Sequence, residues 1–144
     1  MIHVPLLFSL LILLNACTTH PPSTKDLQCL TLNIYHEARG EGLMGMLAVG
    51  EITINRVNNK KWPNSICAVV YQDKQFSWTH DQLTDSMKEE EAKHLSQLVA
   101  KLILSGVRLN LTRGATHYHA NYVRPYWAES LIRTTTINKH IFYK

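Results

Sequence analysis

A histidine, an arginine and two glutamates lie close together in the segment NIYHEARGEG, residues 33–42. A histidine followed at once by a glutamate can begin the zinc-protease motif H-E-x-x-H, in which both histidines bind one metal ion. That motif requires a second histidine one helical turn after His36, and the residue at that position is Gly40. The segment therefore lacks the zinc motif, and we expect neither a metal nor any other cofactor.

Glu37 falls at the edge of an apolar helix face. Apolar residues recur at helical spacing over residues 27–38, and the two glycines that follow end the pattern. At about 100° per residue, Glu37 lies within about 20° of Leu30, whereas His36 lies on the solvent side. The carboxyl group of Glu37 is therefore predicted to point toward the border of the core.

Burial would suit Glu37 to one kind of chemistry, the delivery of a proton. A carboxyl group turned toward a core loses hydration, which raises its pKa. Raising the pKa of a glutamate from about 4.3 to roughly 6–7 costs about 3 kcal/mol. That cost is tolerated where a proton must be delivered at neutral pH. The alternative is a structural glutamate in an ion pair with Arg39 or Arg56, and position alone favours this structural role.

The elements around Glu37 are those of one globular domain. The chain has 144 residues, 45% of them hydrophobic and 18% charged, which is enough for one core and too little for two. The apolar segment 44–57 predicts a buried central helix in which Gly45 and Gly50 allow close packing. The predicted fold class is α+β, mainly α with a small β element. The next predicted elements are a short helix at 64–72, with Pro63 in its first turn, and a turn or short strand at 73–78. A long amphipathic helix follows, which a capping box of Ser86 and Glu89 opens and Gly106 ends. Short strands are predicted within 114–123 and 134–143.

The charge of the chain limits its partners. The formal net charge is +4 with the histidines neutral. A modest positive excess suits a polyanion such as nucleic acid, a membrane surface or an acidic cell-wall polymer. The chain has no Lys/Arg-rich block and no nucleic-acid-binding motif, so nucleic acid is not an expected partner.

The N-terminus has the pattern of an export signal. Residues 5–14 carry no charge, and this run is too short for a transmembrane helix, which needs about 20 apolar residues. The sequence LNAC that ends at Cys17 resembles a bacterial lipobox, in which the cysteine carries a lipid. The alternatives are a plain cleaved signal or an N-terminal core helix. We expect a lipoprotein signal peptide at 1–16, a polar tether at 17–26, a domain at 27–144, and a lipid-anchored periplasmic protein at the outer membrane.

Export would place Cys29 and Cys67 in an oxidising compartment. Paired thiols usually form a disulfide there. A closed loop of that size would stabilise the fold by about 4 kcal/mol. The alternative is two unpaired buried cysteines that pack as small apolar side chains.

Four segments of the chain carry a resemblance to a known family. They are CLTLNIYHEARGEGLMGMLAVGEITINRV, WPNSICAVVYQDKQFSW, GATHYHA and INKHIFY, in this order from Cys29 to the C-terminus. Together they resemble the SleB-type cell wall hydrolases, a family that includes spore cortex-lytic enzymes. The resemblance implies a compact lysozyme-like domain that cleaves the glycan strand of peptidoglycan. It also supports the disulfide, because both cysteines match positions common in Gram-negative members.

The same resemblance implies roles for individual residues. The family motif E-A-R-G-E falls on residues 37–41, and its first glutamate, Glu37, matches the catalytic acid of the family. Glu41 would be a second carboxylate at the substrate site or a structural group at the helix end. Met46 stands where the family usually has glutamine, and the lost polar side chain would alter the floor of the cleft. The residues expected to line the cleft by motif match, each with a packing role as the alternative, are Gln75, Phe76, Ser77, His117 and Tyr118.

Aromatic and histidine side chains offer two further interpretations. Trp78 and Trp127 are candidates for stacking on sugar rings, with a core position as the alternative. His117 and His119 would share one strand face, but two ligands alone do not make a zinc site.

Cleavage of a glycoside needs an acid and a group that stabilises or attacks the oxocarbenium-like centre. Without a second placed carboxylate, one glutamate acts as acid and then as base while the C6 hydroxyl of the substrate attacks, which leaves an anhydromuramic end. By resemblance we expect this lytic transglycosylase chemistry at the β-1,4 bond between muramic acid and glucosamine, carried out by a monomer on peptidoglycan. The alternatives are a non-catalytic peptidoglycan-binding lipoprotein and a cell-wall amidase.

Overall fold

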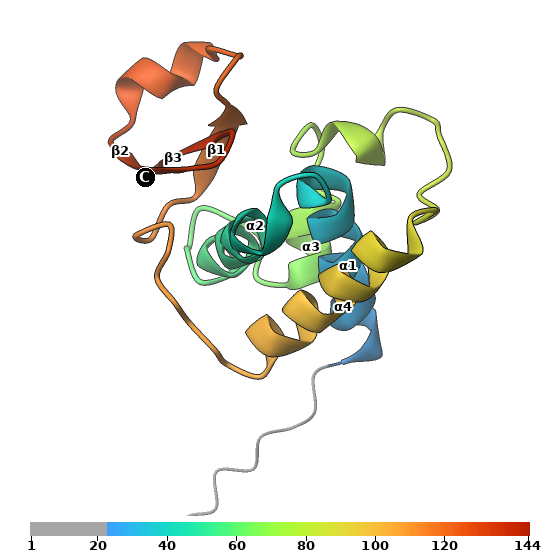
Figure 1. The fold of residues 1–144 in the computed structure, drawn as a ribbon. Helices are drawn as coiled ribbons and strands as arrows, with labels where there is room; N and C mark the ends of the chain where they lie inside the picture. The colour runs from blue at the N-terminus through green and yellow to red at the C-terminus, as the bar shows by residue number, and fades with distance from the viewer. Residues whose placement is uncertain (1–22) are drawn as a thin grey trace, which may run out of the picture.

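Four α-helices and a small three-stranded sheet make up residues 23–144, the part of the chain that this computed structural model describes (Figure 1). The expected class, α+β and mainly α, is confirmed. The helices are α1 (Thr24–Ala38), α2 (Gly42–Val57), α3 (Ile66–Val70) and α4 (Glu90–Leu104), and the short 3-10 helices are η1 (Ser77–Thr79) and η2 (Tyr126–Ser130). The strands are β1 (His117–Ala120), β2 (Arg133–Ile137) and β3 (His140–Tyr143).

Helix α1 begins at Thr24 because Ser23 caps it. The hydroxyl oxygen of Ser23 accepts the backbone N–H of Asp26 at 3.0 Å. The helix therefore takes in the last residues of the segment expected to be a polar tether. The predicted signal peptide and Cys17 lie outside the described residues. Within residues 23–144, no helix has both the length and the apolar character needed to span a membrane.

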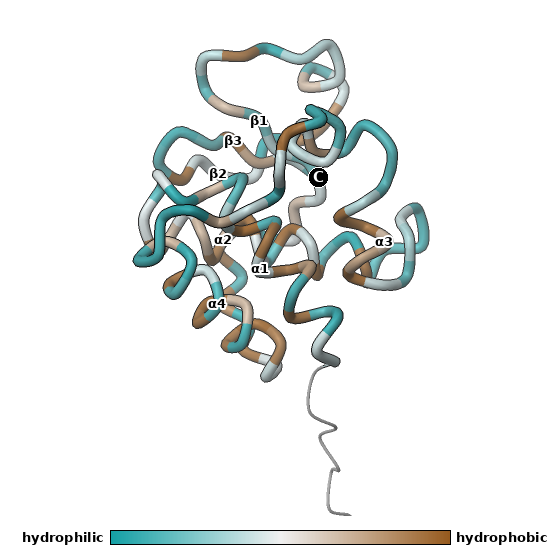
Figure 2. Tube along the Cα trace, turned by 90° about the vertical axis from the view of Figure 1, so that its right-hand side faces the viewer, coloured by the Kyte–Doolittle hydropathy of each residue, from teal (hydrophilic) through white to brown (hydrophobic). Residues whose placement is uncertain are grey.

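Helix α2 is the buried central helix that its apolar sequence predicts. It packs against the three other helices on one side and against the sheet on the other (Figure 1). Gly50 permits this close packing, because a Cβ atom there would overlap Ile103 of α4 and lie 3.1 Å from Ile34 of α1. Figure 2 shows that apolar residues gather on the helices, whereas the connecting loops are largely hydrophilic.

Cys29 of α1 and Cys67 of α3 form the predicted disulfide, with their Cα atoms 5.3 Å apart. The two cysteines are 38 residues apart in the chain, so the bond closes a loop that contains all of α2. It links α3 directly to the helix that carries Glu37.

One sequence-based expectation about the region around α3 is wrong and another is confirmed. Pro63 precedes α3 instead of lying in its first turn, because Ser65 caps that helix by accepting the backbone N–H of Ala68 at 3.3 Å. The segment 73–78 forms the predicted turn, which leads into η1, and does not form the alternative short strand.

The capping box expected at the start of the long helix does not form either. Helix α4 begins at Glu90, and Ser86 lies in the loop before it. Contacts with α1 decide where the helix starts: the backbone N–H of Glu89 donates to the Tyr35 hydroxyl at 3.1 Å, and the Glu89 carboxylate pairs with Arg39 at 2.9 Å. Long-range partners thus replace the local cap.

The sheet is antiparallel with strand order β1–β3–β2. Tyr118 of β1 stands opposite Phe142 of β3. Phe142 is fully buried and belongs to a small core cluster with Ala48 and Ile52 of α2. This cluster fixes the sheet against the central helix and brings β1 to the helical layer.

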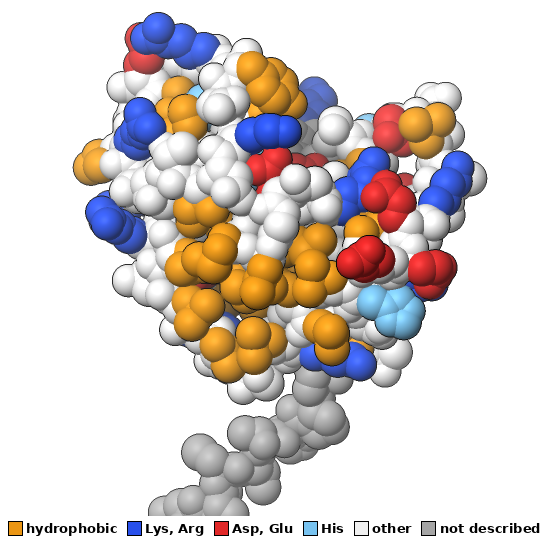
Figure 3. Space-filling view, viewed as in Figure 1, with side chains coloured by type: hydrophobic (Ala, Val, Ile, Leu, Met, Phe, Trp, Pro, Cys, Tyr) orange, Lys and Arg blue, Asp and Glu red, His pale blue; other side chains and the backbone are white. Residues whose placement is uncertain are grey.

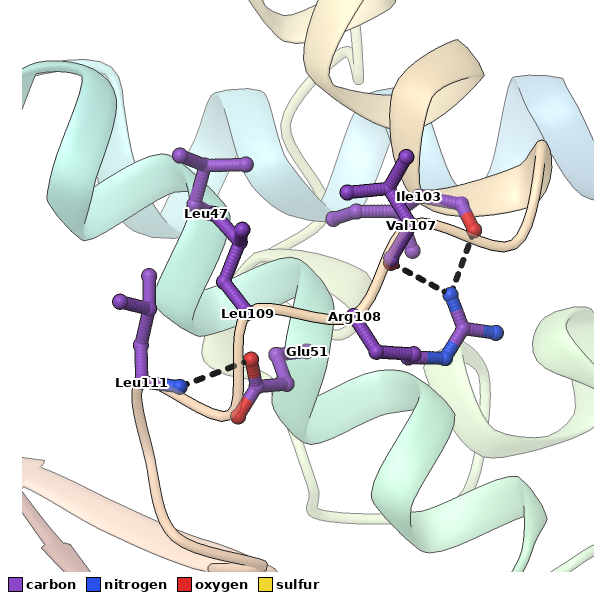
Figure 4. A pocket seen from close by; sticks show the side chains of 7 residues that line it. All are labelled: Leu47, Glu51, Ile103, Val107, Arg108, Leu109 and Leu111. Carbon is purple, nitrogen blue, oxygen red and sulfur yellow. Dashed lines mark hydrogen bonds between the residues drawn. The ribbon is translucent and has the colours of Figure 1, made fainter.

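Glu51 of α2 holds the loop between α4 and β1 (Figure 4). Its carboxylate accepts the backbone N–H of Leu111 at 3.1 Å, the backbone N–H of Thr112 at 3.0 Å and the Thr112 hydroxyl at 2.6 Å. The cavity beside it measures only about 10 Å³, which is room for one water molecule at most. Glu51 is therefore a structural carboxylate, and the cavity of Figure 4 is too small to hold a substrate.

Candidate active site

Glu37, in the last turn of α1, meets Tyr118 of β1. The Tyr118 hydroxyl donates a hydrogen bond to Oε2 of Glu37 at 2.7 Å. Burial raises the pKa of Glu37 above its ordinary value, although the Tyr118 hydrogen bond and the charge of Arg56 both act to lower it. A carboxyl group with a raised pKa keeps its proton at higher pH, as a general acid requires.

The structural alternative for Glu37, an ion pair with Arg39 or Arg56, is not formed in residues 23–144. Arg39 pairs with Glu89 of α4. Arg56 donates from Nε to the backbone oxygen of Thr116 at 2.7 Å. Neither arginine therefore holds Glu37 in its ionised form through a direct ion pair.

Arg56 of α2 is a buried cation near this carboxyl group. Its guanidinium carbon lies 4.2 Å from the ring centroid of Trp62 and 5.4 Å from that of Phe76. Burial lowers the pKa of Arg56 to about 10, while its interactions with Tyr118 and Glu37 act to raise it. The group therefore stays positively charged at neutral pH.

Aromatic rings surround His117, the first residue of β1. Its ring lies 5.4 Å from that of Trp62 and 5.4 Å from that of Trp127. Burial lowers the pKa of His117, and the positive charges of Arg56 and Lys61 lower it further. The imidazole is therefore neutral at neutral pH and adds no charge to the site.

The second histidine of the HYH segment is engaged by protein groups. Nε2 of His119 lies 2.9 Å from the Tyr143 hydroxyl, and its Nδ1 lies 2.8 Å from the backbone oxygen of Ala120. Across residues 23–144, no three His, Cys, Asp or Glu side chains are arranged to hold a metal ion.

Among the residues expected to line the cleft, Tyr118 binds Glu37, and His117 lies between the rings of Trp62 and Trp127. Phe76 is buried, and its ring packs against the guanidinium group of Arg56. The packing alternative is therefore the one observed for Phe76, and a role in the cleft stays a prediction.

The remaining cleft candidates lie on or beside η1. Gln75 is half-buried and Ser77 is exposed, and neither side chain hydrogen bonds to Glu37, so their substrate role stays a prediction. Trp78 is buried and stacks on His36 with ring centroids 4.7 Å apart. Trp78 belongs to the core cluster and also lines the cavity of about 550 Å³ described below, so its stacking on a sugar ring stays a prediction. His36 is half-buried, whereas the sequence predicted a position on the solvent side.

Glu41 and Met46 both have structural surroundings. The Glu41 carboxylate accepts the backbone N–H of Lys139 at 3.0 Å, and its backbone oxygen accepts the side chain of Asn138. These bonds tie the start of α2 to the turn between β2 and β3, which supports the structural interpretation of Glu41. Met46 is 1% exposed in the larger core cluster, and it also lines a cavity beside Arg39 and Glu89, so its effect on the cleft floor stays a prediction.

No sequence pattern indicated two aromatic residues near this site. They are Trp62, whose ring lies beside Arg56, and His140, whose ring lies beside Tyr118. The ring of His140 lies 5.1 Å from that of Tyr118, and burial lowers its pKa. Trp62 lies in the loop after α2 and His140 in a strand, and neither position carries a local pattern that signals a site. For Arg56, the sequence predicted only an alternative role, in an ion pair with Glu37.

The surface beside α1 is hollowed between the sheet and the loop that precedes α4, and acidic side chains lie in the hollow (Figure 3). A cavity of about 550 Å³ lies between α1, η1 and the loop 81–89, where His36, Arg39 and Trp78 line it together with residues of that loop. This volume is within the range of ligand pockets. Glu37 is not among the residues that line this cavity.

The fold and the shielded acid define a lysozyme-like enzyme domain, and comparison with known proteins identifies its family. The Cell Wall Hydrolase family matches residues 40–143, which is most of the chain. The chain therefore belongs to the cell wall hydrolase family, and the prediction of a cell-wall-cleaving enzyme is confirmed at this level. The matched segment begins just after Glu37.

Two solved structures are similar to this one. The catalytic domain of the Bacillus cereus SleB protein has a TM-score of 0.67 and 29% sequence identity, and the match covers 90% of this chain and 99% of that domain. The catalytic domain of the germination-specific lytic transglycosylase SleB from Bacillus anthracis has the same TM-score and identity, with 85% and 96% covered. The expected fold is confirmed.

Curated relatives give the same family. The spore cortex-lytic enzyme of Bacillus cereus is 27% identical over 124 residues, which are 85% of this chain and 45% of that enzyme. The enzyme of the same description from Halalkalibacterium halodurans is 27% identical over 122 residues, 83% of this chain and 35% of that enzyme. The chain thus spans less than half the length of these relatives, and its resemblance to the SleB-type family is confirmed.

Proposed function

We propose that this protein cleaves the glycan strand of peptidoglycan by lytic transglycosylase chemistry, with Glu37 as both acid and base. The observation that supports the proposal most is the pair of Glu37 and Tyr118, in which burial raises the pKa of the carboxyl group and a single hydroxyl orients it at 2.7 Å. Family membership and the lytic transglycosylase among the similar structures support the substrate and the reaction. The bond proposed is the β-1,4 linkage between muramic acid and glucosamine.

The reaction needs one carboxyl group in two charge states. Tyr118 donates to Oε2 of Glu37, so the proton of Glu37 is carried by Oε1. Glu37 gives this proton to the glycosidic oxygen as the bond to C1 of muramic acid breaks, and positive charge develops at C1. The carboxylate then accepts the proton of the C6 hydroxyl while O6 bonds to C1. The products are a glucosamine hydroxyl and a 1,6-anhydromuramic end, no water is consumed, and Glu37 is protonated again.

The neighbouring carboxylates support a scheme with one glutamate. Glu41 is bound by the backbone of the turn between β2 and β3, and Glu51 is bound by the loop that leads to β1. Among the described residues, Glu37 is the glutamate for which burial raises the pKa.

Mass analysis of the products from purified sacculi tests the proposal. We expect fragments with anhydromuramic ends from the wild type, none from Glu37→Gln, and near wild-type yield from the control Glu41→Gln. Reducing muramic ends would show hydrolysis instead, and free stem peptides would show an amidase. Binding to sacculi without any cleavage by the wild type would support the non-catalytic alternative.

The proposal includes a lipid anchor at Cys17, and it is based on the sequence LNAC after the apolar run. Thr18, in place of an aspartate, is typical of lipoproteins sorted to the outer membrane. Replacing Cys17 by Ser should release the protein from outer-membrane fractions. Unchanged retention in the membrane would contradict the anchor.

A further inference from the structure

Arg56 is a buried arginine that does not use all of its hydrogen-bond donors. The residue is 4% exposed, and its Nη1 atom has no hydrogen-bond partner within residues 23–144. An unpaired charged donor in the interior is costly, more so than a neutral one. A fold that keeps such a group has a use for its charge, because an apolar residue would pack there at lower cost.

Three contacts hold the guanidinium in one place. Its Nε donates to the backbone oxygen of Thr116 at 2.7 Å, and its plane is flanked by the rings of Trp62 and Phe76. Thr116 directly precedes the strand that carries Tyr118. The contact with Thr116 therefore also fixes Arg56 relative to the hydroxyl that orients Glu37.

The guanidinium group of Arg56 and the carboxyl group of Glu37 interact through their charges without bonding to each other directly. The charge of each group acts on the other, yet they form neither an ion pair nor a hydrogen bond. A direct ion pair would keep Glu37 ionised, and it would then have no proton to donate. A guanidinium held at a longer distance in the interior still favours the carboxylate once it has formed, because charges interact more strongly there than in water.

We propose that Arg56 is a positioning residue for the acid–base cycle of Glu37, and that its fixed guanidinium stabilises the carboxylate formed when Glu37 gives up its proton. The inference rests on the proposed function for the identity of the reaction. The interaction between the two charges belongs to the free protein and is measurable without substrate.

Other charged and titratable groups also surround Glu37. Arg39 is engaged by Glu89, and Glu41 is engaged by the Lys139 backbone. Arg56 and Tyr118 are the groups that act on the pKa of Glu37. The remaining groups on the elements packed around it are His36 on α1, Lys61 after α2, His117 and His119 on β1, and His140 on β3.

NMR titration of the Glu37 side-chain carboxyl carbon in the free protein is the direct test. The resonance is assigned by its absence in Glu37→Gln. Arg56→Met removes the cation, so the pKa of Glu37 should rise by about one pH unit. Arg56→Lys, which keeps a charge, should raise it less, and the control Arg124→Met, at an exposed ion pair with Glu129, should leave it unchanged. An unchanged pKa in Arg56→Met overturns the proposal.

Kinetics on sacculi separate this role from binding and from packing. For Arg56→Met we expect kcat to fall about 10-fold or more, KM to stay within about twofold, and the alkaline limb of the pH–rate profile to move to higher pH. A raised KM with unchanged kcat would mean that Arg56 binds substrate, which overturns the proposal. A fall in kcat with the alkaline limb unmoved would mean a structural role and also overturns it.

Two controls keep the result interpretable. If circular dichroism shows that Arg56→Met is unfolded, Arg56→Lys becomes the test. In this variant the pKa of Glu37 must rise and kcat must fall, and both changes must be smaller than those expected for Arg56→Met. If the wild type forms no anhydromuramic ends while the pKa shift is present, the proposed reaction has failed and the electrostatic interaction stands.

Discussion

Two glutamates on neighbouring helices, Glu37 of α1 and Glu51 of α2, are both shielded from solvent but have different surroundings. Glu51 accepts three hydrogen bonds from Leu111 and Thr112, whereas Glu37 accepts one, from Tyr118. Several donors stabilise a carboxylate, while burial with few donors favours the protonated form. Burial alone therefore does not distinguish the two glutamates, which differ in the number of hydrogen-bond donors around the carboxyl group.

The two glutamates also act on the same segment of the chain. Residues 111–118 run from the Glu51 carboxylate into β1, and they end at the tyrosine that orients Glu37. The Glu51 carboxylate anchors the start of this segment, and Glu37 meets its end. Glu51 therefore helps to fix the position of Tyr118 beside Glu37.

The largest expected effect is that of Glu37→Gln. Turnover of sacculi should fall by 10²–10⁴-fold, because a positioned acid typically contributes that much. The melting temperature should be unchanged or higher. Since the folded-state pKa of Glu37 is raised above its ordinary 4.5, the wild type loses stability as pH rises through the folded-state pKa. The gain in melting temperature should therefore grow as the pH rises above 4.5. A difference that does not change with pH would contradict the raised pKa.

The double replacement of Cys29 and Cys67 by Ser tests a purely structural link on the helix of Glu37. For a loop of 38 residues, the loss in free energy of unfolding should be about 4 kcal/mol. Turnover per folded molecule should stay near that of the wild type. Urea unfolding of oxidised wild type and of the double variant gives the free energies, and equal midpoints would contradict the prediction.

Glu51→Ala should show the opposite phenotype to Glu37→Gln. The change leaves the donors of Leu111 and Thr112 without their partner, so the free energy of unfolding should fall by roughly 3 kcal/mol. Activity of the folded fraction should remain within several-fold of the wild type. Urea unfolding gives the stability, with the exposed Glu91→Ala as the matched control. Lost activity at an unchanged free energy of unfolding would contradict the structural role of Glu51.

Tyr118→Phe removes the hydrogen bond that lowers the pKa of Glu37. The pKa of Glu37 should therefore rise further, and the alkaline limb of the pH–rate profile should move to higher pH. We expect the maximal rate to fall about 10-fold, because the carboxyl group loses its orienting partner. A pH–rate profile that keeps its alkaline limb in place would show that Tyr118 does not act on Glu37.

Glu41→Gln should have the smallest effect. The amide oxygen of the variant can still accept the backbone N–H of Lys139, so the free energy of unfolding should change by less than about 1 kcal/mol. Activity should stay within a few-fold of the wild type. A loss comparable to that of Glu37→Gln would mean that the reaction uses two carboxylates.

Much of the helical layer could be predicted from local patterns, whereas its disulfide was predicted from the export signal and the family resemblance. The apolar spacing of residues 27–38 and the predominantly apolar run 44–57 indicate α1 and α2, because each pattern is fulfilled within a few turns of one helix. The same spacing put Glu37 at the edge of the core. The start of α4 could not be predicted in this way, because Tyr35 and Arg39 bind Glu89 from another helix.

The sequence by itself determined which face of α1 carries Glu37, and its match to the family motif predicts that it is the acid. Only the tertiary structure decided what surrounds its carboxyl group. Tyr118 is 81 residues away in the chain, and Arg56 reaches the site with Nε bound to a backbone oxygen. The charge state of a shielded carboxyl group depends on how many donors and charges come near it in space. Those groups come from two other elements, β1 and α2, so no local pattern around residue 37 contains them.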